Sequence, residues 1–404
     1  MTIQIKPSQS FSLYSPEFIN NPYPFYDQLR SVDPICWIHS LKYPGWYITG
    51  YEEAVAALKD TRLFNRIPLP ETTKKYDHLK NIQNDMMLFK NKEDHKRLRL
   101  LVSEAFTQKA IEYYRPYIEE TVHHLLDEVS GRKTMDVVLD FAFPLASSVI
   151  AKILGIPEKD RQRFREWAVD LIQAIDFTRS RRELLNGNET VMKLMIFFKE
   201  LIHKRRQAPH DDVISYLIKE EEQGDKLTNN EIVSTCILLV IAGHETTVNL
   251  ISNSILSLLN HQEQLSILKE NPFLIEKAVE EFLRYESPTQ MVARTASETL
   301  NLNGKTIKKG EQVYILLGAA NRDPKKFEKA NELEINRDPN PHLAFGYGSH
   351  FCIGSQLARF EAQVSIQTFV QKMNRLQLVH PSPQWRSLIG FRSLEELLIT
   401  FDLD

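Results

Sequence analysis

A glycine-rich stretch around a single cysteine is the part of the sequence best suited to chemistry. It reads FGYGSHFCIG from Phe345 to Gly354, with two glycines before Cys352 and one after it. Glycine lets a backbone turn sharply and approach a flat ligand closely. A helix is expected to begin directly after the cysteine, and its N-terminal dipole and free N–H groups favour a thiolate. Such a thiolate suits a haem iron, to which it donates electron density as the proximal ligand.

Two other interpretations of this stretch are a buried structural cysteine and a zinc site. Free cysteine is commonly buried, but six fixed positions of this kind arise by chance with a probability of about 10⁻⁵ over the whole chain. A zinc site using His350 and Cys352 lacks the paired C-x-x-C or H-x₃-H partner that structural zinc uses. Cys36 and Cys236 lie in apolar surroundings, and we expect both to pack in the core.

A second group of reactive residue types lies in a long apolar segment, as AGHETT at residues 242–247. The small residues Ala242 and Gly243 would let a flat macrocycle or dioxygen approach a helix, and Gly243 lies on nearly the same face as Thr246. Thr246 can donate a hydrogen bond to bound oxygen, and Glu245 can supply protons. Alone, the segment equally suits a buried helix that is bent by its hydroxyl side chains.

Two charged pairs are weaker signals. Glu281 and Arg284 are three residues apart on one helix face, and an exposed pair of this kind is worth less than about 1 kcal/mol. His95 and Arg99 are four residues apart, as on any basic helix face in water. Neither pair predicts a function by itself.

Hydrophobic periodicity and punctuation predict a mostly helical chain with a minor sheet. Helical patterns dominate from about Lys92 to Gly310, and the T-x-x-E pair Thr228 and Glu231 predicts the start of a long helix. Around them we expect strands at Trp46–Gly50, Leu300–Asn303 and Gln312–Leu317, helices at Tyr51–Lys59, Thr228–Asn260, Pro272–Tyr285 and Ile353–Met373, and an irregular stretch at Asn321–Gly348. An irregular stretch of this length usually has a function.

Composition excludes several classes of protein. The 404 residues are 42% apolar and 25% charged, with a net charge of −3, which is typical of a globular protein and not of a dedicated nucleic-acid binder. We see no uncharged apolar run of about 20 residues, so no membrane span is expected. The start has no signal-peptide pattern, and three cysteines suit a reducing compartment, so a cytoplasmic protein is expected.

The cysteine loop, the AGHETT segment and the E-x-x-R pair share their order with a known family. The sequence resembles the cytochrome P-450 family of haem-thiolate monooxygenases over nearly its whole length. The resemblance implies a mainly α fold with minor β sheets, the triangular prism of that family, formed by residues 1–404 as a single domain with its β-richer parts at about 1–65 and 295–345. It also implies a haem b (Fe protoporphyrin IX) cofactor, held between the long central helix and the helix after the cysteine loop.

The resemblance implies a role for each matching residue. Cys352 would be the axial ligand of the haem iron, and Glu245 and Thr246 the catalytic pair. Contacts to the cofactor would come from His95, Arg99, Ala242, Gly243, Arg294, Phe345, Gly346, His350, Gly354 and Ala358. Haem has only two propionates, so at least one of His95, Arg99, Arg294 and His350 would contact it indirectly. Arg337 would join Glu281 and Arg284 in a structural cluster, and Arg322 would also be structural. The substrate pocket would include Leu238, Ile241, Gln290, Met291, Phe391 and the loop from Arg66 to Phe89.

Several segments, among them YPGWYITGYEEAVAALKD and RYESPTQMVARTASE, are similar to the members of the family that serve biotin synthesis. That similarity implies hydroxylation of adjacent mid-chain carbons of a long fatty acid, or of an acyl group on acyl carrier protein, followed by C–C cleavage to a pimeloyl product. From Thr178 to Arg206, eight Lys and Arg residues oppose three Glu, a net charge of +5. Such a basic segment could steer an acidic carrier protein, or it could be an ordinary solvated helix face.

The resemblance also implies a separate flavodoxin or ferredoxin-type electron donor, to which Lys96 and Arg97 could offer positive charge. A monomer is expected. The alternatives are a hydroxylase of a macrolide, terpenoid or other secondary metabolite, a non-catalytic haem sensor, and a metal-free helical interaction protein. The intact Glu245 and Thr246 pair speaks against the sensor, because a sensor needs no proton delivery.

Overall fold

The computed structural model describes residues 13, 15–39, 43–64, 74–222 and 227–403. Internal contacts divide the chain into two compact units. The first unit gathers residues 1–68, 253–352 and 380–396, and the second gathers residues 69–252, 353–379 and 397–404. Helices dominate among the described residues, with three small sheets, which confirms the mainly α fold class.

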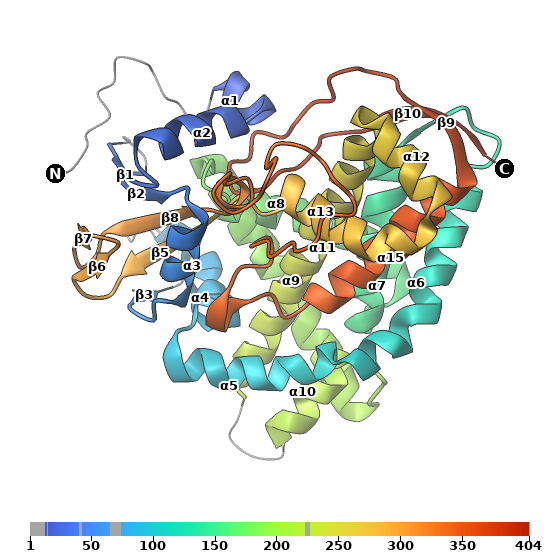
Figure 1. Ribbon diagram of the computed structural model, residues 1–404. Coiled ribbons are helices and arrows are strands. Elements are labelled where there is room, and N and C mark those ends of the chain that lie inside the picture. The colour runs from blue at the N-terminus through green and yellow to red at the C-terminus, as the bar shows by residue number, and fades with distance from the viewer. Residues whose placement is uncertain (1–12, 14, 40–42, 65–73, 223–226, 404) are drawn as a thin grey trace. The chain divides into compact units, whose positions relative to one another are not determined.

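The first unit contains a five-stranded sheet (Figure 1). Its strands are β1 (Ile35–Ile38), β2 (Gly45–Ile48), β3 (Leu63–Phe64), β5 (Met291–Ala296) and β8 (Gln312–Leu316). They lie in the order β1-β2-β8-β5-β3, with β2 and β8 parallel and the other neighbours antiparallel. Aromatic and β-branched side chains, which suit a pleated and half-buried surface, fill β1, β2 and β8.

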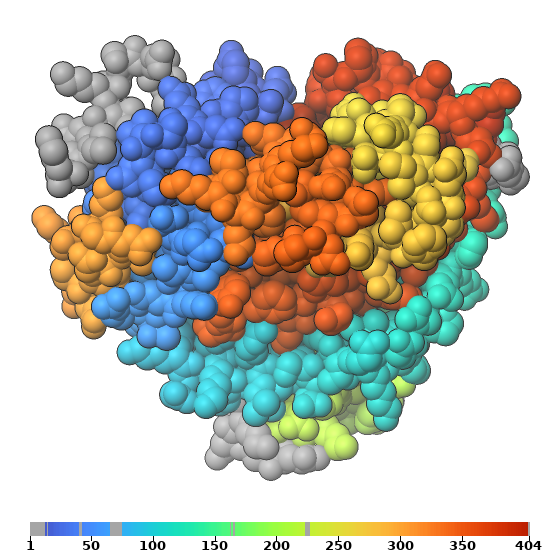
Figure 2. Space-filling model, viewed as in Figure 1, coloured from blue at the N-terminus to red at the C-terminus, as the bar shows by residue number. Residues whose placement is uncertain are grey.

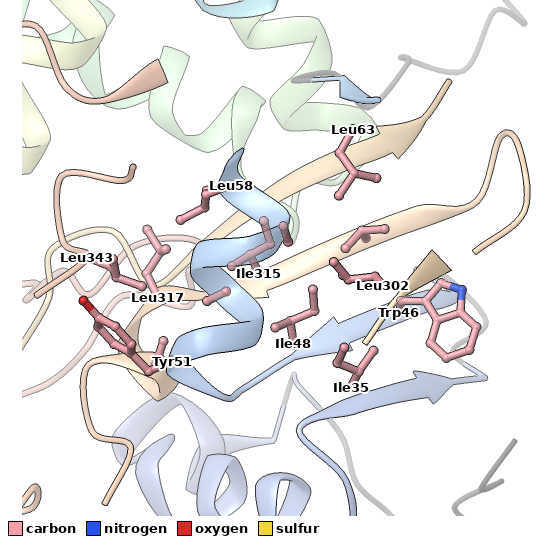
Figure 3. Close-up of a cluster of buried hydrophobic side chains, with 14 of the residues drawn as sticks. Ile35, Trp46, Ile48, Tyr51, Leu58, Leu63, Leu302, Ile315, Leu317 and Leu343 are labelled. Carbon is pink, nitrogen blue, oxygen red and sulfur yellow. The ribbon is translucent and has the colours of Figure 1, made fainter. Parts of the chain in front are cut away.

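Helix α3 (Tyr51–Lys59) packs on this sheet and forms a shared hydrophobic core with it (Figure 3). Ile48 of β2 and Ile315 of β8 are fully buried there, beside Leu58 of α3. A two-stranded ribbon of β6 (Leu300–Leu302) and β7 (Lys305–Ile307) adds Leu302 to the same cluster. Leu343 joins it from the irregular segment before the cysteine loop, so this core also anchors that segment.

The remaining helices of the first unit are short. They are α1 (Pro16–Asn20), α2 (Tyr23–Val32), α12 (Gln262–Glu270), the 3₁₀ turn η6 (Pro272–Leu274), α13 (Ile275–Tyr285), α14 (Leu317–Ala320) and the 3₁₀ turn η7 (Gly348–His350). Residues 321–347 form no helix or strand, as the sequence predicts. In Figure 2 this coil, in orange, covers the surface beside α12, in yellow. The Ile335 N–H donates to the Gln264 side chain of α12 at 3.0 Å.

A buried carboxylate organises this coil. Glu281 and Arg284 of α13 are fully buried, and the guanidinium of Arg284 binds both carboxylate oxygens at 2.7 and 2.8 Å. Arg337 Nε donates to the same two oxygens at 3.2 and 3.1 Å, and the Asn340 amide adds a bond of 3.1 Å. The structure thus brings Glu281, Arg284 and Arg337 together, and the pairs are well shielded from solvent.

The two arginines also bind backbone carbonyls of the coil. Arg284 Nη1 donates to the carbonyl oxygens of Asn321 and Ala330 at 3.0 and 2.7 Å, and Arg337 Nη1 donates to Glu328 at 2.7 Å. A coil has no ladder of its own, so its buried carbonyls need such donors. The cluster therefore holds the chain that leads to the cysteine loop.

The second unit is mostly helical (Figure 1). Its α-helices are α4 (Asp77–Asp85), α5 (Lys92–Ser103), α6 (Gln108–Glu128), α7 (Phe143–Ile153), α8 (Arg161–Ile175), α9 (Arg181–Gln207), α10 (Val213–Glu222) and α15 (Ser355–Lys372). Its shorter turns are η1 (Lys74–Tyr76), η2 (Met87–Phe89), η3 (Glu104–Phe106), the π-helical η4 (Val137–Ala142) and η5 (Glu158–Asp160). An antiparallel sheet joins β4 (Thr134–Asp136), β10 (Leu398–Leu403) and β9 (Met373–Leu378) in that order.

Helix α11 (Asn229–Asn260) is the longest described helix, and it contributes residues to both units. It begins with the expected capping box, in which Thr228 N–H donates to Glu231 Oε2 at 2.9 Å and Glu231 N–H donates to Thr228 Oγ1 at 3.2 Å. Among the described residues, α11 alone is long and apolar enough to cross a membrane. However, 83% of its most apolar window is buried inside the protein, as in a core helix.

Most predicted elements are confirmed, and the errors have local causes. The helix Tyr51–Lys59 and the end of the long helix at Asn260 match the structure. The prediction that helical patterns dominate up to Gly310 is wrong after Pro288, because β5 pairs with β8 and β3 there and β6 pairs with β7. The last helix begins at Ser355, two residues later than predicted.

The buried carboxylate leads to a stability prediction. Glu281→Gln removes the one anion that two buried guanidinium groups share, and breaking such a pair typically lowers the free energy of unfolding by about 3 kcal/mol. Thermal or urea unfolding of the purified protein measures the effect. Glu276→Gln, at an exposed position of the same helix, is the matched control and should change stability little. Equal stability of both variants would show that the cluster does not hold the coil.

Candidate functional site

The cysteine loop is held by short-range backbone bonds of the first unit. The Cys352 N–H donates to the Phe345 carbonyl at 2.9 Å, which closes the loop, and the Gly346 N–H donates to Leu343 at 2.8 Å. Cys352 is exposed, and it lies two residues before Gly354, the N-cap of α15. The loop therefore presents one thiol from a fixed backbone, close to a helix N-terminus that favours the thiolate.

Two glycines are required by this backbone. Gly346 and Gly348 have φ angles of +72° and +74°, a region that side chains with a Cβ rarely adopt. A Cβ on Gly348 would also lie 3.0 Å from the Leu58 carbonyl oxygen at the end of α3. The Lys59 ammonium lies 4.9 Å from the centre of the Tyr347 ring, so α3 and the loop are packed together at this point.

The other cysteines are buried, as predicted. Burial raises the pKa of Cys36 to about 11 and raises the pKa of Cys236 further. Both thiols are therefore inert at neutral pH. Within the described part of the chain, no group of three or more His, Cys, Asp or Glu side chains could hold a metal ion, so a multi-ligand zinc site at His350 and Cys352 has no support there.

Helix α11 is buried along almost its whole length, with one gap. From residue 231 to residue 259, every residue is buried except Ala242, Gly243 and Thr246. These three residues lie on adjacent positions of one face, because three or four residues make one helical turn. Thr246 Oγ1 donates to the Ala242 carbonyl at 2.7 Å, and Glu245 beside it is buried. The helix thus offers a small, nearly flat face with one hydroxyl.

His244 lies in the same turn and faces the other way. Its Nε2 is 2.6 Å from Ser147 Oγ on α7, and its Nδ1 is 3.2 Å from the Val240 carbonyl. Burial lowers the pKa of His244 to about 4, so the ring is neutral at neutral pH. No local pattern in the sequence predicts the contact between His244 and Ser147, because the two residues are 97 positions apart.

The candidate propionate ligands come from three elements. His95 and Arg99 lie on α5, where burial and then the charge of Arg99 lower the pKa of His95. Arg294 lies on β5 and is 5% exposed, and burial lowers its pKa to about 10. A buried guanidinium is stabilised by an anion such as a carboxylate. His350 is half-buried in η7, next to the cysteine.

The residues proposed for the substrate pocket have different surroundings. Leu238 and Ile241 are buried on α11, and Met291 is the buried first residue of β5. Phe391 forms a bridge with Thr289, two residues before Met291. Of the remaining loop, residues 66–73 lie outside the described residues, and most of residues 74–89 are helical instead of a loop.

Gln290 is held by hydrogen bonds within the first unit. Tyr26 donates to its amide oxygen at 3.2 Å, and its amide nitrogen donates to the Ser287 carbonyl at 2.8 Å. Both ends of the buried amide are thus engaged inside the first unit. The role of Gln290 as a substrate contact stays a prediction, as does that of its neighbour Met291.

The positive charge that α9 can offer to a partner is smaller than the count of its basic residues suggests. Arg205 is buried, where it binds Asp212 at 2.5 Å and the Gly155 carbonyl at 2.7 Å, and Arg206 pairs with Glu221. Their positive charges are therefore not available to a partner, contrary to the sequence-based expectation. Arg206 is exposed but paired, and the other exposed basic residues of α9 are Arg181, Arg182, Lys193, Lys199 and Lys204.

The charge offered by α5 is reduced in the same way. Arg97 binds Glu231 at 2.5 Å and lies 3.8 Å from Asp94, so it is largely neutralised. Lys96 remains exposed. Of the two residues expected to face an electron donor, only Lys96 keeps an exposed position that suits this role.

The first unit also has a polar cavity of about 740 Å³. Arg322 and Arg392 line it, and both pair with Glu286, at 3.6 and 2.7 Å. Arg322 lies between the rings of Tyr23 and Tyr285, 3.4 and 3.9 Å from their centres. Arg322 is therefore structural, as expected.

Comparison with known proteins agrees with this chemistry. A family model described as cytochrome P-450 matches residues 12–391. The biotin biosynthesis cytochrome P-450 of Bacillus subtilis (strain 168) is 60% identical over 391 residues, which cover 97% of this chain and 99% of the relative. A polyketide biosynthesis cytochrome P-450 of the same strain is 39% identical, covering 96% of this chain and 98% of the relative.

A solved structure is also similar. It is a cytochrome P-450 crystallised in complex with an acyl carrier protein that is ligated to hexadec-9Z-enoic acid. The two chains superpose with a TM-score of 0.92 and are 60% identical, over 96% of this chain and 100% of the other.

Proposed function

This chain belongs to the cytochrome P-450 family and is a monooxygenase, and we propose that its substrate is a long-chain acyl group on acyl carrier protein. The reaction would hydroxylate two adjacent mid-chain carbons and then cleave the bond between them. The cleavage would use a further O₂ with two electrons and two protons, and it would give two aldehydes and two waters. A last O₂-dependent oxidation of the carrier-bound aldehyde to a carboxylate, again with two electrons and two protons and release of one water, would give a pimeloyl product for biotin synthesis. Each hydroxylation inserts one atom of O₂ into a C–H bond and releases the other as water, which consumes two electrons and two protons.

The family implies a haem cofactor, and the residues present fit haem b (Fe protoporphyrin IX). Cys352 is an exposed thiol on a rigid loop near a helix N-terminus, which suits an iron ligand. When bound, the haem would supply a thiolate-ligated iron that activates dioxygen. The flat exposed face of Ala242 and Gly243 suits a macrocycle, with Phe345, Gly346, Gly354 and Ala358 as further contacts. The buried Arg294, with His95, Arg99 and His350, would bind the propionates.

Glu245 and Thr246 would manage the protons of the reaction. Thr246 holds its hydroxyl proton on the Ala242 carbonyl in the structure, 2.7 Å away. To donate into the site, Oγ1 would turn its proton away from that carbonyl by rotation about the Cβ–Oγ1 bond. The Glu245 carboxyl would supply protons to the same site.

The substrate is supported most strongly by the relative from biotin synthesis, which is 60% identical over nearly the whole chain. The similar solved structure holds an acyl-ligated carrier protein, which supports a carrier-bound substrate over a free fatty acid. The polyketide relative, at 39% identity, supports hydroxylation of a secondary metabolite as the second candidate.

A surface of α9 suits the carrier protein. The exposed side chains of Leu185, Met192 and Ile196 are seven and four residues apart, so they form one stripe along the helix. Exposed basic residues, among them Arg181 and Arg182, flank this stripe. An acidic partner such as acyl carrier protein would be attracted by the charges and would cover the apolar stripe.

The remaining parts of the proposal follow from the reaction. The electrons would come from a separate flavodoxin or ferredoxin-type donor, attracted in part by Lys96. The protein would work in the cytoplasm, as a monomer and as one haem-binding domain over residues 1–404. Among relatives of this class the carrier protein is the macromolecular partner with the most direct support, since one is seen in the similar solved structure.

Product analysis tests the substrate. With palmitoyl carrier protein, NADPH, a flavodoxin reductase and flavodoxin, the enzyme should form pimeloyl carrier protein, identified by mass spectrometry. The expected order is a hydroxy product, then a diol, then the cleaved product. Hydroxylation without C–C cleavage, or turnover of a macrolide in preference to the acyl group, would instead favour the second candidate.

The iron ligand is tested by the carbon monoxide difference spectrum of the reduced protein. We expect the red-shifted Soret band of thiolate-ligated haem in the wild type and its complete loss in Cys352→Ala, because no other exposed thiol lies among the described residues. Cys236→Ala, at a buried site, is the control and should keep the band. A red-shifted band in Cys352→Ala would contradict the assignment.

The carrier-protein surface is tested by charge reversal. Arg181→Glu combined with Arg182→Glu should weaken binding of palmitoyl carrier protein by about tenfold at low salt, with a smaller effect at high salt. The spin-state titration of the ferric enzyme measures the affinity. Lys308→Glu combined with Lys309→Glu makes the same change of net charge at exposed positions of the first unit. Equal affinity in both double variants would remove the α9 surface from the proposal.

A further inference from the structure

A histidine–serine pair fixes helix α11 against helix α7 behind the candidate oxygen site. His244 is 1% exposed and Ser147 is 8% exposed. The atoms Nε2 and Oγ are 2.6 Å apart, and the His244 ring packs on Phe143, with 5.4 Å between the ring centres. A Cβ on Gly243 would lie 2.9 Å from Ile150, so the two helices are in close contact here. Phe143, Ser147 and Ile150 follow one face of α7.

The partners determine which nitrogen of His244 carries the proton. The Val240 carbonyl can only accept a hydrogen bond, so Nδ1, 3.2 Å away, is the donor. In the neutral ring, Nε2 is then the acceptor and the Ser147 hydroxyl is the donor. The buried ring is satisfied at both nitrogens, and its tautomer is fixed by the fold.

The position of His244 on the helix explains how this pair can limit rotation of α11. Successive residues of an α-helix are turned by about 100°, so His244 is turned by about 200° from both Ala242 and Thr246. Ala242 and Thr246 are therefore on the opposite side of the helix from the pair with Ser147. A bond on the back of the helix limits rotation of the front about the helix axis.

The same turn carries two bonds from side chains to backbone carbonyls four residues earlier. His244 binds the Val240 carbonyl, and Thr246 binds the Ala242 carbonyl. Such bonds compete with the helix's own N–H groups and loosen or bend a helix locally. A turn loosened in this way needs an external support if its side chains are to keep a defined position.

On the basis of the haem monooxygenase function proposed above, we propose that His244 and Ser147 together position the catalytic turn Ala242–Thr246, and so determine how much of the reductant is used for product. The pair is a positioning device and takes no part in proton transfer. It sets the rotation of α11, and thereby the place of the Thr246 hydroxyl and of the Glu245 carboxyl.

Coupling of electrons to product is the quantity that the pair should control. His244→Leu keeps the size of the side chain and removes both bonds, and we expect product per NADPH to fall by about threefold, with hydrogen peroxide rising to match. Ser147→Ala should have an effect in the same direction, and the double variant should be no worse than His244→Leu alone. His244→Gln, whose amide can still reach Ser147, should recover part of the coupling. Thr246→Ala provides a reference for uncoupling at the site itself.

The control is Ser148→Ala, which removes a half-buried hydroxyl from the next position of α7. It should leave coupling unchanged, and every variant should keep the red-shifted carbon monoxide band. Normal coupling in His244→Leu, or effects of the two single variants that multiply in the double variant, would overturn the proposal.

Hydrogen–deuterium exchange separates this proposal from the proposed function. Peptides that cover residues 240–247 should exchange at least about fivefold faster in Ser147→Ala and His244→Leu than in the wild type and in Ser148→Ala. This readout depends on neither substrate nor turnover. Faster exchange would support the positioning role even if palmitoyl carrier protein is not the substrate, whereas unchanged exchange would overturn it even in an active enzyme.

Discussion

The first unit depends on one interaction, the binding of the Glu281 carboxylate by two arginines. The carboxylate is fully buried, and Arg284 and Arg337 both bind it. Removal of one partner from such a buried group of charges is strongly destabilising. The same arginines bind carbonyls of a coil that has no secondary structure. That coil ends in the cysteine loop, and Leu343 fastens it to the sheet core just before the loop. The Cys352 thiol thus lies at the end of a coil that one buried cluster of charged side chains holds in place.

Helix α11 is buried along almost its whole length but leaves one exposed gap. A helix buried on all sides is normally made of large apolar residues, which would leave no room for a ligand. Here the exposed gap consists of the small residues Ala242 and Gly243 and one hydroxyl, that of Thr246. Two polar side chains of this turn have defined partners. Thr246 binds the Ala242 carbonyl of the same helix, and His244 binds Ser147 of α7. The exposed gap therefore combines small side chains with polar groups that are held in defined positions.

The chemistry and the choice of substrate have different structural origins. The cysteine loop and the exposed turn of α11 carry the residues proposed for oxygen insertion, and they do not determine the substrate. The stripe of exposed apolar residues on α9, with its flanking arginines, is a surface feature that suits a protein partner. A carrier protein held there could present one long chain in a fixed orientation, which is what cleavage at a defined carbon requires.

The sequence by itself determined the elements whose signals are local. Three of them depend only on neighbouring residues and were predictable. They are the glycine-rich loop around Cys352, the capping box of Thr228 and Glu231, and the helix Tyr51–Lys59. Only the tertiary structure decided which charges are free and which side chains pair across the fold. Arg205 counts as a surface charge in the sequence but is buried against Asp212, Gln290 is held by Tyr26, and His244 meets Ser147 of another helix. Burial and hydrogen bonding depend on residues far apart in the chain, and local spacing carries no information about them.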